Sequence, residues 1–310
     1  MDIMKKNLFK ISNTVKNDTT YLRFHYANLQ EQSIFFDCCK FFSASDLQLD
    51  MLSQMHTHDF FLIIYFRAGE GTLCVDFKNV PIEDNTIYFL SPNDLHSFND
   101  LKNISGYAIS FSEDFLLLLN NDIQNKLSMF IHHPTWCLHY CKVGSRAQEK
   151  IKRDLELIDE EFIANCYDET IKNDYLSALL SMFFLDCERL CDCEQEGRFI
   201  VPLESCKIYQ RFLELLEKKF SKYHQVKEYA SVIGVSPSVL SSNTQLCCGL
   251  TPLKIINNRI VLEAKRMLKY STLSVKEISH KLGFNDPSYF NKFFRRVTGL
   301  SPAEFKNIDC

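Results

Sequence analysis

The sequence lacks any apolar run of the roughly 18 residues that a membrane-spanning helix needs. Residues 1–10 also lack the apolar core of a signal peptide. No low-complexity stretch argues for a disordered chain. We therefore expect a globular protein that stays in the cytoplasm and has no membrane partner.

A complete metal-binding pattern is missing as well, although the chain has 13 cysteines. Cys187, Cys191 and Cys193 form the one cluster, and no second Cys or His pair follows at the spacing of a zinc site. Scattered cysteines in a chain without an export signal are better explained as reduced, mostly buried residues. No nucleophile–base–orienter set is visible either. We expect neither a metal, nor a cofactor, nor an enzyme.

The length and the charge distribution point to two different modules. A chain of 310 residues predicts two domains and a connector. Residues 205–310 contain 17 Lys and Arg against 8 Asp and Glu, a net of +9, whereas residues 1–204 contain 18 against 31, a net of −13. A basic C-terminal module on an acidic body is typical of a protein that contacts phosphate groups.

The segment 274–306 is dense in signals for the start and end of helices. Ser274 and Glu277 form a capping box, and Gly283 predicts the end of the short helix that follows. Asp286, followed by proline, predicts the N-cap of a helix that runs to about residue 298, and residues 301–304 repeat the capping pattern. Two short helices joined by a tight turn predict a helix-turn-helix unit at about 274–298.

The second helix of this unit has two distinct faces. Its packing side is aromatic and aliphatic, and a polar, basic ridge of the kind that enters a major groove follows the other side. The packing side contains Tyr289, Phe290, Phe293, Phe294 and Val297, and the ridge contains Ser288, Asn291, Lys292, Arg295 and Arg296.

A repeat at an offset of about 50 residues predicts a second such unit. Ser236-Pro237-Ser238 matches Asp286-Pro287-Ser288, and Gly249-Leu250 matches Gly299-Leu300. We therefore expect a first helix-turn-helix at about 226–247. Between the units, a helix at about 252–270 has an inward stripe that includes Leu253, and Arg259 and Arg266 on its polar side. Such a helix can hold two recognition helices about one DNA turn apart.

At this point the chain resembles the AraC/XylS family of bacterial transcription regulators. The residues that carry the resemblance are SVKEISHKLGFNDPSYFNKFFRRVTGLSPAEFK at 274–306 and NNRIVLEAKRML at 257–268. The resemblance covers about 206–306 and implies that two recognition helices read bases while phosphate contacts surround them. It also implies an activator that works with RNA polymerase.

The first unit departs from the family pattern, because residues 242–246 are Ser, Asn, Thr, Gln and Leu where the second unit has Lys, Phe, Phe, Arg and Arg. Base contacts remain available there, but electrostatic attraction to DNA should be weak. The residues expected to contact DNA are Asn285, Asp286, Ser288, Tyr289, Asn291, Lys292, Arg295 and Arg296 in the second unit, Ser236, Ser238, Ser241, Ser242 and Gln245 in the first, and Arg259 between them.

The N-terminal half has the pattern of short strands and turns. Strands are expected at 60–66, 72–77, 85–90, 96–98 and 106–111, with a turn at Gly69-Glu70-Gly71. This spacing suggests a small antiparallel barrel or jelly roll. Residues 52–111 resemble the cupin-type sensor domain of AraC relatives, which implies a small-molecule effector.

Three histidines leave several interpretations open. His56, His58 and His96 could bind a metal as in many cupins, but Leu62 stands where the cupin glutamate would be. They could instead line an effector pocket, or be structural histidines hydrogen-bonded at strand ends. The candidate effector-binding residues are His56, His58, Tyr65, His96 and Phe98.

Residues 148–191 have helical periodicity, and residues 194–204 have the composition of a linker. The helices pack either on their own barrel or against a second subunit, and the family favours a homodimer. The expected fold is α+β: a cupin-like sensor domain at 1–130, a helical linker at 131–204, and an all-α DNA-binding domain at 205–310.

The sequence therefore predicts a sequence-specific DNA-binding transcription regulator that responds to a small molecule. Its partners would be double-stranded operator DNA, an effector of unknown identity and RNA polymerase. Two alternatives remain open: a metal-dependent cupin enzyme with an appended helical domain, and an interaction protein whose helix-turn-helix shell no longer binds DNA.

Overall fold

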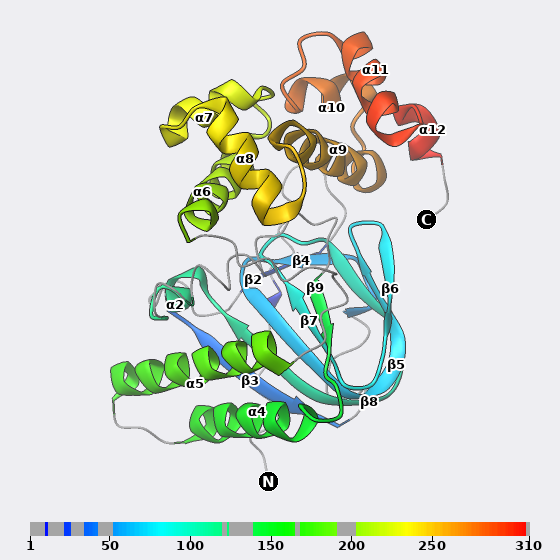
Figure 1. Ribbon diagram of the computed structural model, residues 1–310. Coiled ribbons are helices and arrows are strands. Elements are labelled where there is room, and N and C mark those ends of the chain that lie inside the picture. Colours follow the sequence, from blue (N-terminus) through cyan, green and yellow to red (C-terminus); the bar gives the residue numbers. More distant parts are fainter. Residues whose placement is uncertain are drawn as a thin grey trace. The chain divides into compact units, whose positions relative to one another are not determined.

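The computed structural model describes residues 10–11, 22–25, 34–42, 52–119, 123, 139–164, 168–190 and 203–307. The chain divides into two compact units, one made of residues 1–14 and 21–197 and the other of residues 15–20 and 198–310 (Figure 1). The first unit is a β-sheet with helices and the second is all helical, which confirms the predicted α+β class. The linker expected at 194–204 lies largely outside the described residues.

In the described part of the first unit, the sheet contains nine strands, all paired antiparallel except for β2 with β4. Among these strands the hydrogen-bonded order is β1-β2-β4-β8-β5-β7-β9, with β3 paired to β8 and β6 to β5, so the path does not return to its start. The strands are β1 (Lys10–Ile11), β2 (Leu22–His25), β3 (Phe36–Phe41), β4 (His56–His58), β5 (Phe61–Val75), β6 (Lys78–Ile82), β7 (Thr86–Leu90), β8 (His96–Phe111) and β9 (His139–Lys142).

Two long strands, β5 and β8, form the centre of the sheet, and here the sequence prediction was wrong. The turn expected at residues 69–71 does not form, because β5 continues through it and shifts register against β8 at three places. Gly69 has φ +138° and a Cβ there would meet Ile104 of β8, so glycine lets the two strands approach at a bulge. The chain reverses instead at Asp76 and Phe77, which both have positive φ as a tight hairpin requires.

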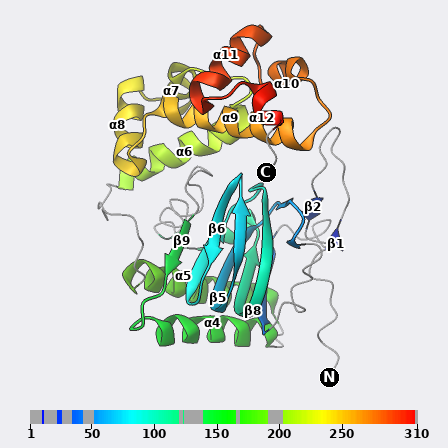
Figure 2. The same ribbon diagram turned by 90° about the vertical axis from the view of Figure 1, so that its right-hand side faces the viewer.

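Both faces of the sheet are buried, which explains the continuous apolar run at the start of β5. Alternate residues Phe61, Ile63 and Tyr65 belong to one core, and Leu62, Ile64 and Phe66 belong to another. The first core includes the inner faces of α4 (Gln148–Ile163) and α5 (Glu169–Leu190), which lie side by side against the sheet (Figures 1 and 2). The second core lies on the opposite face of β5 and includes Phe41, Leu73 and Phe98. A short helix, α2 (Glu113–Leu116), follows β8.

The second unit contains seven helices among its described residues. They are α6 (Leu203–Lys219), α7 (Val226–Ile233), α8 (Pro237–Cys248), α9 (Pro252–Tyr270), α10 (Val275–Lys281), α11 (Pro287–Thr298) and α12 (Pro302–Lys306). The bounds of the last six agree closely with those expected from the sequence, whereas the first was not predicted and begins within the expected linker. None of the described helices of the protein combines the length and the apolar character needed to span a membrane.

Candidate nucleic-acid interface

Two recognition helices, α8 and α11, begin at the capping residues that the sequence indicates. The side chain of Ser236 accepts a hydrogen bond from the backbone N–H of Val239 at 3.2 Å, and that of Asp286 accepts one from the N–H of Ser288 at 2.8 Å. A proline follows each cap at the first helical position, where its missing N–H costs nothing. Each helix ends at a glycine in the left-handed conformation, Gly249 or Gly299. Both recognition helices therefore have the same length and the same defined ends.

The two helices also bury the same positions. Residues 241–250 and 291–300 have the same sequence of buried, half-buried and exposed positions, residue for residue. Ser242, Gln245 and Leu246 thus occupy the places of Lys292, Arg295 and Arg296. Any surface that α11 presents to DNA therefore has a geometric counterpart on α8 with different chemistry.

The α11 helix is held by an aromatic cluster on its inner side. Phe284, in the turn before the helix, lies 5.2 Å from the ring of Phe290 and 5.1 Å from that of Phe293. Lys292, Arg295 and Arg296 are all exposed, and the guanidinium of Arg296 lies 5.9 Å from the ring centre of Phe293. None of these three cations makes a salt bridge with a residue in the described part of the chain. They are available to pair with phosphates or with guanine bases.

On α8 the corresponding side is polar, and its buried side chains form hydrogen bonds with backbone carbonyls of the same helix. Asn243 and Thr244 are buried where the second unit has Phe293 and Phe294. The Asn243 amide donates to the Val239 carbonyl at 2.6 Å, and the Thr244 hydroxyl donates to the Ser241 carbonyl at 3.1 Å. Neither polar side chain is therefore left buried without a partner, which would be costly.

The candidate DNA contacts fall into two groups. One group projects into solvent: Asn285, Asp286, Ser288, Tyr289, Lys292, Arg295, Arg296, Ser236, Ser238, Ser242 and Gln245. Asn291 and Ser241 are half-buried, and the Asn291 amide donates to the Pro287 carbonyl at 3.0 Å. Several exposed members also have local roles, since the Ser242 hydroxyl donates to the Ser238 carbonyl at 3.1 Å.

Arg259 is the exception, and its assignment to DNA is corrected. Its guanidinium is buried, lies 2.8 Å from Glu217 of α6 and 3.0 Å from Glu263, and stacks 4.0 Å from the ring centre of Phe220. Burial alone would lower the pKa of Arg259, but Coulombic attraction to these carboxylates outweighs it and raises that pKa. Arg259 and Arg266 in turn lower the pKa of Glu263 against the effect of burial. The sequence does not reveal this, because Glu217 lies 42 residues from Arg259.

Two other residues of α9 also lie elsewhere than expected. Arg266 is buried, whereas Leu253, expected inside, is exposed.

A contact between the loop after α6 and the turn of the second helix-turn-helix unit was also not predicted. The loop after α6 brings the His224 ring within 4.7 Å of the Phe284 ring, and the His224 Nε2 donates to the Leu282 carbonyl at 2.9 Å. Gly283 has φ +82°, and a Cβ at this position would overlap the backbone carbonyl of Ser221. The turn of the second unit is thus packed tightly against the loop that precedes the first unit.

The three histidines expected near an effector do form a cluster. The His56 ring lies 4.2 Å from that of His96, which lies 4.9 Å from that of His58, and all three are buried. The Nδ1 of His56 donates to the Gln54 carbonyl at 2.8 Å, and that of His96 to the Asp94 carbonyl at 3.0 Å. Burial lowers the pKa of His56 to about 4 and that of His58 to about 3. The rings of Phe60 and Phe98 contact this cluster, so it belongs beside the second core of the sheet.

Tyr65 does not join the histidines. It lies in the core under α4 and α5, on the other face of the sheet from Phe98, and its hydroxyl donates to the Asn85 amide oxygen at 2.9 Å. The candidate effector-binding residues therefore do not form one site. Within the ranges that the structure describes, no group of three or more His, Cys, Asp or Glu is arranged to hold a metal ion.

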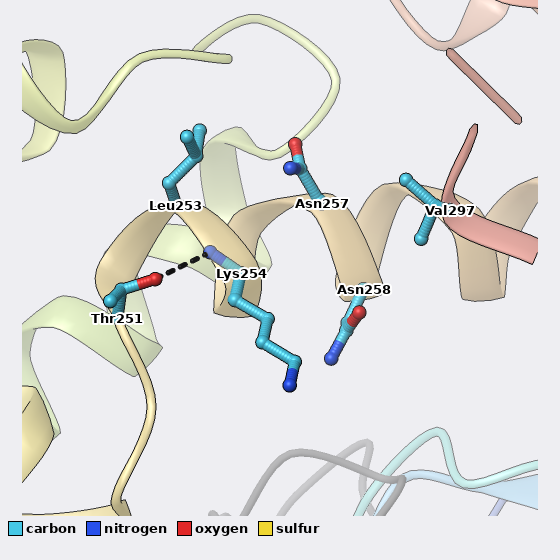
Figure 3. A pocket seen from close by; sticks show the side chains of 6 residues that line it. All are labelled: Thr251, Leu253, Lys254, Asn257, Asn258 and Val297. Carbon is cyan, nitrogen blue, oxygen red and sulfur yellow. Dashed lines mark hydrogen bonds between the residues drawn. The ribbon is translucent and has the colours of Figure 1, made fainter.

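A pocket of about 340 Å³ lies in the helical unit, along α9 (Figure 3). Its lining residues are Thr251, Leu253, Lys254, Asn257, Asn258 and Val297. Lys254 and Asn258 point to one side of α9, and Leu253 and Asn257 point to the other (Figure 3). This pocket follows the outside of a helix and is separate from the histidine cluster of the sheet.

A paired helix-turn-helix unit in one chain with an antiparallel sheet unit defines a DNA-binding regulator with a sensor domain. The family model "Helix-turn-helix domain" matches residues 229–308, and "AraC-like ligand binding domain" matches residues 48–140. The protein belongs to the AraC family of transcriptional regulators.

The individual relatives are distant, and two of the three described here match most of the chain. The transcriptional activator RhaR of Shigella dysenteriae is 20% identical over 257 residues, which are 82% of this chain and 87% of RhaR. Among solved structures, ToxT of Vibrio cholerae is 14% identical over 89% of this chain and 98% of its own, with a TM-score of 0.38. The DNA-binding domain of AdpA, solved with a target DNA, is 27% identical over 32% of this chain and 88% of its own, with a TM-score of 0.29.

Proposed function

We propose that this regulator is a sequence-specific transcription activator that reads a bipartite operator with α8 and α11 and responds to a small molecule. The observation that carries the proposal is the chemistry of α11. Three exposed cations project from a helix whose opposite side is fixed by aromatic packing. A rigid helix with a basic outer ridge fits the major groove.

The sensor role rests on the sheet unit. Its family match is to a ligand-binding domain, and the buried histidine cluster lies beside its second core. A small molecule that binds one arrangement of the sheet better than another would shift the population of the DNA-competent protein. In that state the protein would recruit RNA polymerase to a promoter.

The outer side of α5 supports a homodimer. Its inner side packs on the sheet, but Ile171, Tyr175, Ala178 and Leu185 are exposed on one helical stripe. The stripe is nearly symmetric about Ala178, so a second copy in antiparallel orientation would place Ile171 against Leu185 and the two small alanines at the crossing. The same arrangement brings the acidic start of α5, at Glu169, towards Arg189 at the partner's other end.

The alternative of a metal-dependent cupin enzyme has less support. Leu62 occupies the place of the cupin glutamate, and its side chain is buried in the second core. The hydrogen bonds from Nδ1 of His56 and His96 to backbone carbonyls do not decide the matter, because structural and metal-ligating histidines both make them. Among the described residues, however, no group of three or more His, Cys, Asp or Glu is arranged to hold a metal ion.

The test is a selection of the full-length protein against a random DNA pool at fixed salt. Enrichment of a motif with two blocks about one helical turn apart is the expected result. A pool that stays unenriched, with and without a cell extract as the source of effector, would contradict the proposed function.

A further inference from the structure

The recognition face of α8 has a composition that its counterpart on α11 lacks. No residue from Pro237 to Cys248 is charged. Val239 is 41% exposed and Leu246 is 54% exposed, and they lie at the positions of Tyr289 and Arg296. Single exposed apolar side chains are common on protein surfaces, but here they replace an aromatic residue and a cation on the face that should meet DNA.

These apolar residues lie together with polar ones on one ridge. Val239, Ser242 and Leu246 are spaced i, i+3 and i+7, so they follow one line along the helix. Gln245 is exposed directly beside them. The ridge therefore offers hydroxyl, amide and methyl groups, but it offers no cation.

This set of groups favours one kind of base pair. Guanine is most often bound by Arg or Lys, and α8 has neither. Adenine is recognised by the amide of Gln or Asn, and the C5-methyl group of thymine by apolar side chains. The remaining basic residues of the helical unit, which has a net charge of +9 over 205–310, would supply the phosphate contacts that hold α8 in the groove.

We propose that α8 reads an A·T-containing half-site, in which Val239 and Leu246 contact thymine methyl groups. The inference rests on the proposed function, since it requires that both units bind DNA. It assigns the two halves of the operator different chemistry: methyl and amide contacts under α8, and cationic contacts under α11.

The experiment uses the DNA enriched by the full-length protein and replaces each thymine in turn with deoxyuridine, which removes only the C5-methyl group. At one or more thymines in the α8 half-site we expect affinity to fall about 4-fold, the value of one buried methyl group. Val239→Ala or Leu246→Ala should weaken binding to the thymine operator and should abolish the deoxyuridine penalty at its own contact. Val232→Ala is the matched control, because Val232 is also half-exposed but lies on α7.

The outcomes separate this inference from the proposed function. An enriched motif with one block would overturn the inference and leave a DNA-binding regulator that reads through α11. Two blocks with no deoxyuridine penalty, or with the same penalty in the Val239→Ala and Leu246→Ala variants, would also overturn it, because the second block would then be read without methyl contacts from α8. A pool without enrichment would contradict the proposed function itself.

Discussion

At the scale of single residues, Gly283 has a role that no other residue could fill. Its φ of +82° is strained for any side chain, and an added Cβ would overlap the Ser221 carbonyl. We expect Gly283→Ala to lower the free energy of unfolding of the protein by roughly 3 kcal/mol or more, because both strain and overlap are added. Urea-induced unfolding of the full-length variant would measure this loss.

Two glycines of the same unit provide the control. Gly249 and Gly299 have φ of +67° and +85°, but a Cβ there would meet open space. Alanine at either position should cost only the conformational strain, roughly 1–2 kcal/mol. Equal losses at all three glycines would mean that the close approach of Gly283 to the Ser221 carbonyl contributes nothing.

The buried histidines make the stability of the sheet unit depend on pH. His56 and His58 have folded pKa values of about 4 and about 3, below the ordinary value of 6.5. The unfolded chain therefore binds more protons below pH 6.5, so stability is full above that pH and falls as the pH drops towards 4. Between pH 6.5 and pH 5 each histidine should cost about 2 kcal/mol. Urea unfolding at several pH values would measure the slope.

The substitution His58→Gln should reduce this slope by about one proton, because glutamine does not titrate. His280→Gln is the control, since His280 is exposed on α10. A slope between pH 5 and 6.5 that is the same in wild type and His58→Gln would be inconsistent with a buried neutral histidine at this position.

The caps, but not the buried ion pairs, could be predicted from the sequence at this scale. Ser274, Asp286 and Ser301 begin helices as expected, because a cap depends on residues within one turn. Arg259 was misplaced because its partner Glu217 is on another helix, and local periodicity contains no information on a contact of that range. The same limit applies to His224 and Leu282.

At the scale of elements, helices were easier to predict than strands. The bounds of α7, α9 and α11 follow from prolines, glycines and caps at their ends. In β5 the glycines at 69 and 71 permit bulges rather than a turn, so the strands expected at 60–66 and 72–77 form one strand. The strands expected at 96–98 and 106–111 likewise form one strand, β8. Glycine allows both conformations, and only the partner strand decides between them.

The different chemistry of α8 and α11 predicts a difference in salt dependence. Removing the charge of Lys292, Arg295 or Arg296 by substitution with Gln should weaken binding to the selected operator more than Ser242→Ala or Gln245→Ala. Each substitution that removes a phosphate-binding cation should also reduce the slope of log affinity against log salt by about 0.9. Binding titrations at several salt concentrations would measure both quantities.

The alanine variants of α8 serve as the control, because they remove no charge. We expect their salt slope to equal that of the wild type while their affinity falls. Equal affinity losses in both sets at one salt concentration, with equal slopes, would show that α11 has no electrostatic advantage.

At the scale of the whole molecule, the two-part organisation could be predicted from charge and periodicity, but the role of α4 and α5 could not. Both helices have an inner side that belongs to the core of the sheet unit. The helix α5 is only weakly amphipathic, because apolar residues occupy its outer side as well as its inner side. A sequence pattern cannot tell which of two apolar sides meets the sheet and which remains for another subunit.

The outer apolar side of α5 predicts a dimer that a single charged substitution would disrupt. Ile171→Glu should place a carboxylate in the centre of an apolar contact with Leu185 of the second copy and so raise the dimer dissociation constant at least 10-fold, since burial of an unpaired charge costs more than about 1.4 kcal/mol. Ile163→Glu is the matched control, because Ile163 ends α4, is equally exposed and lies off the stripe. Sedimentation equilibrium would measure both variants. If Ile171→Glu and Ile163→Glu associate equally well, α5 is not the dimer contact.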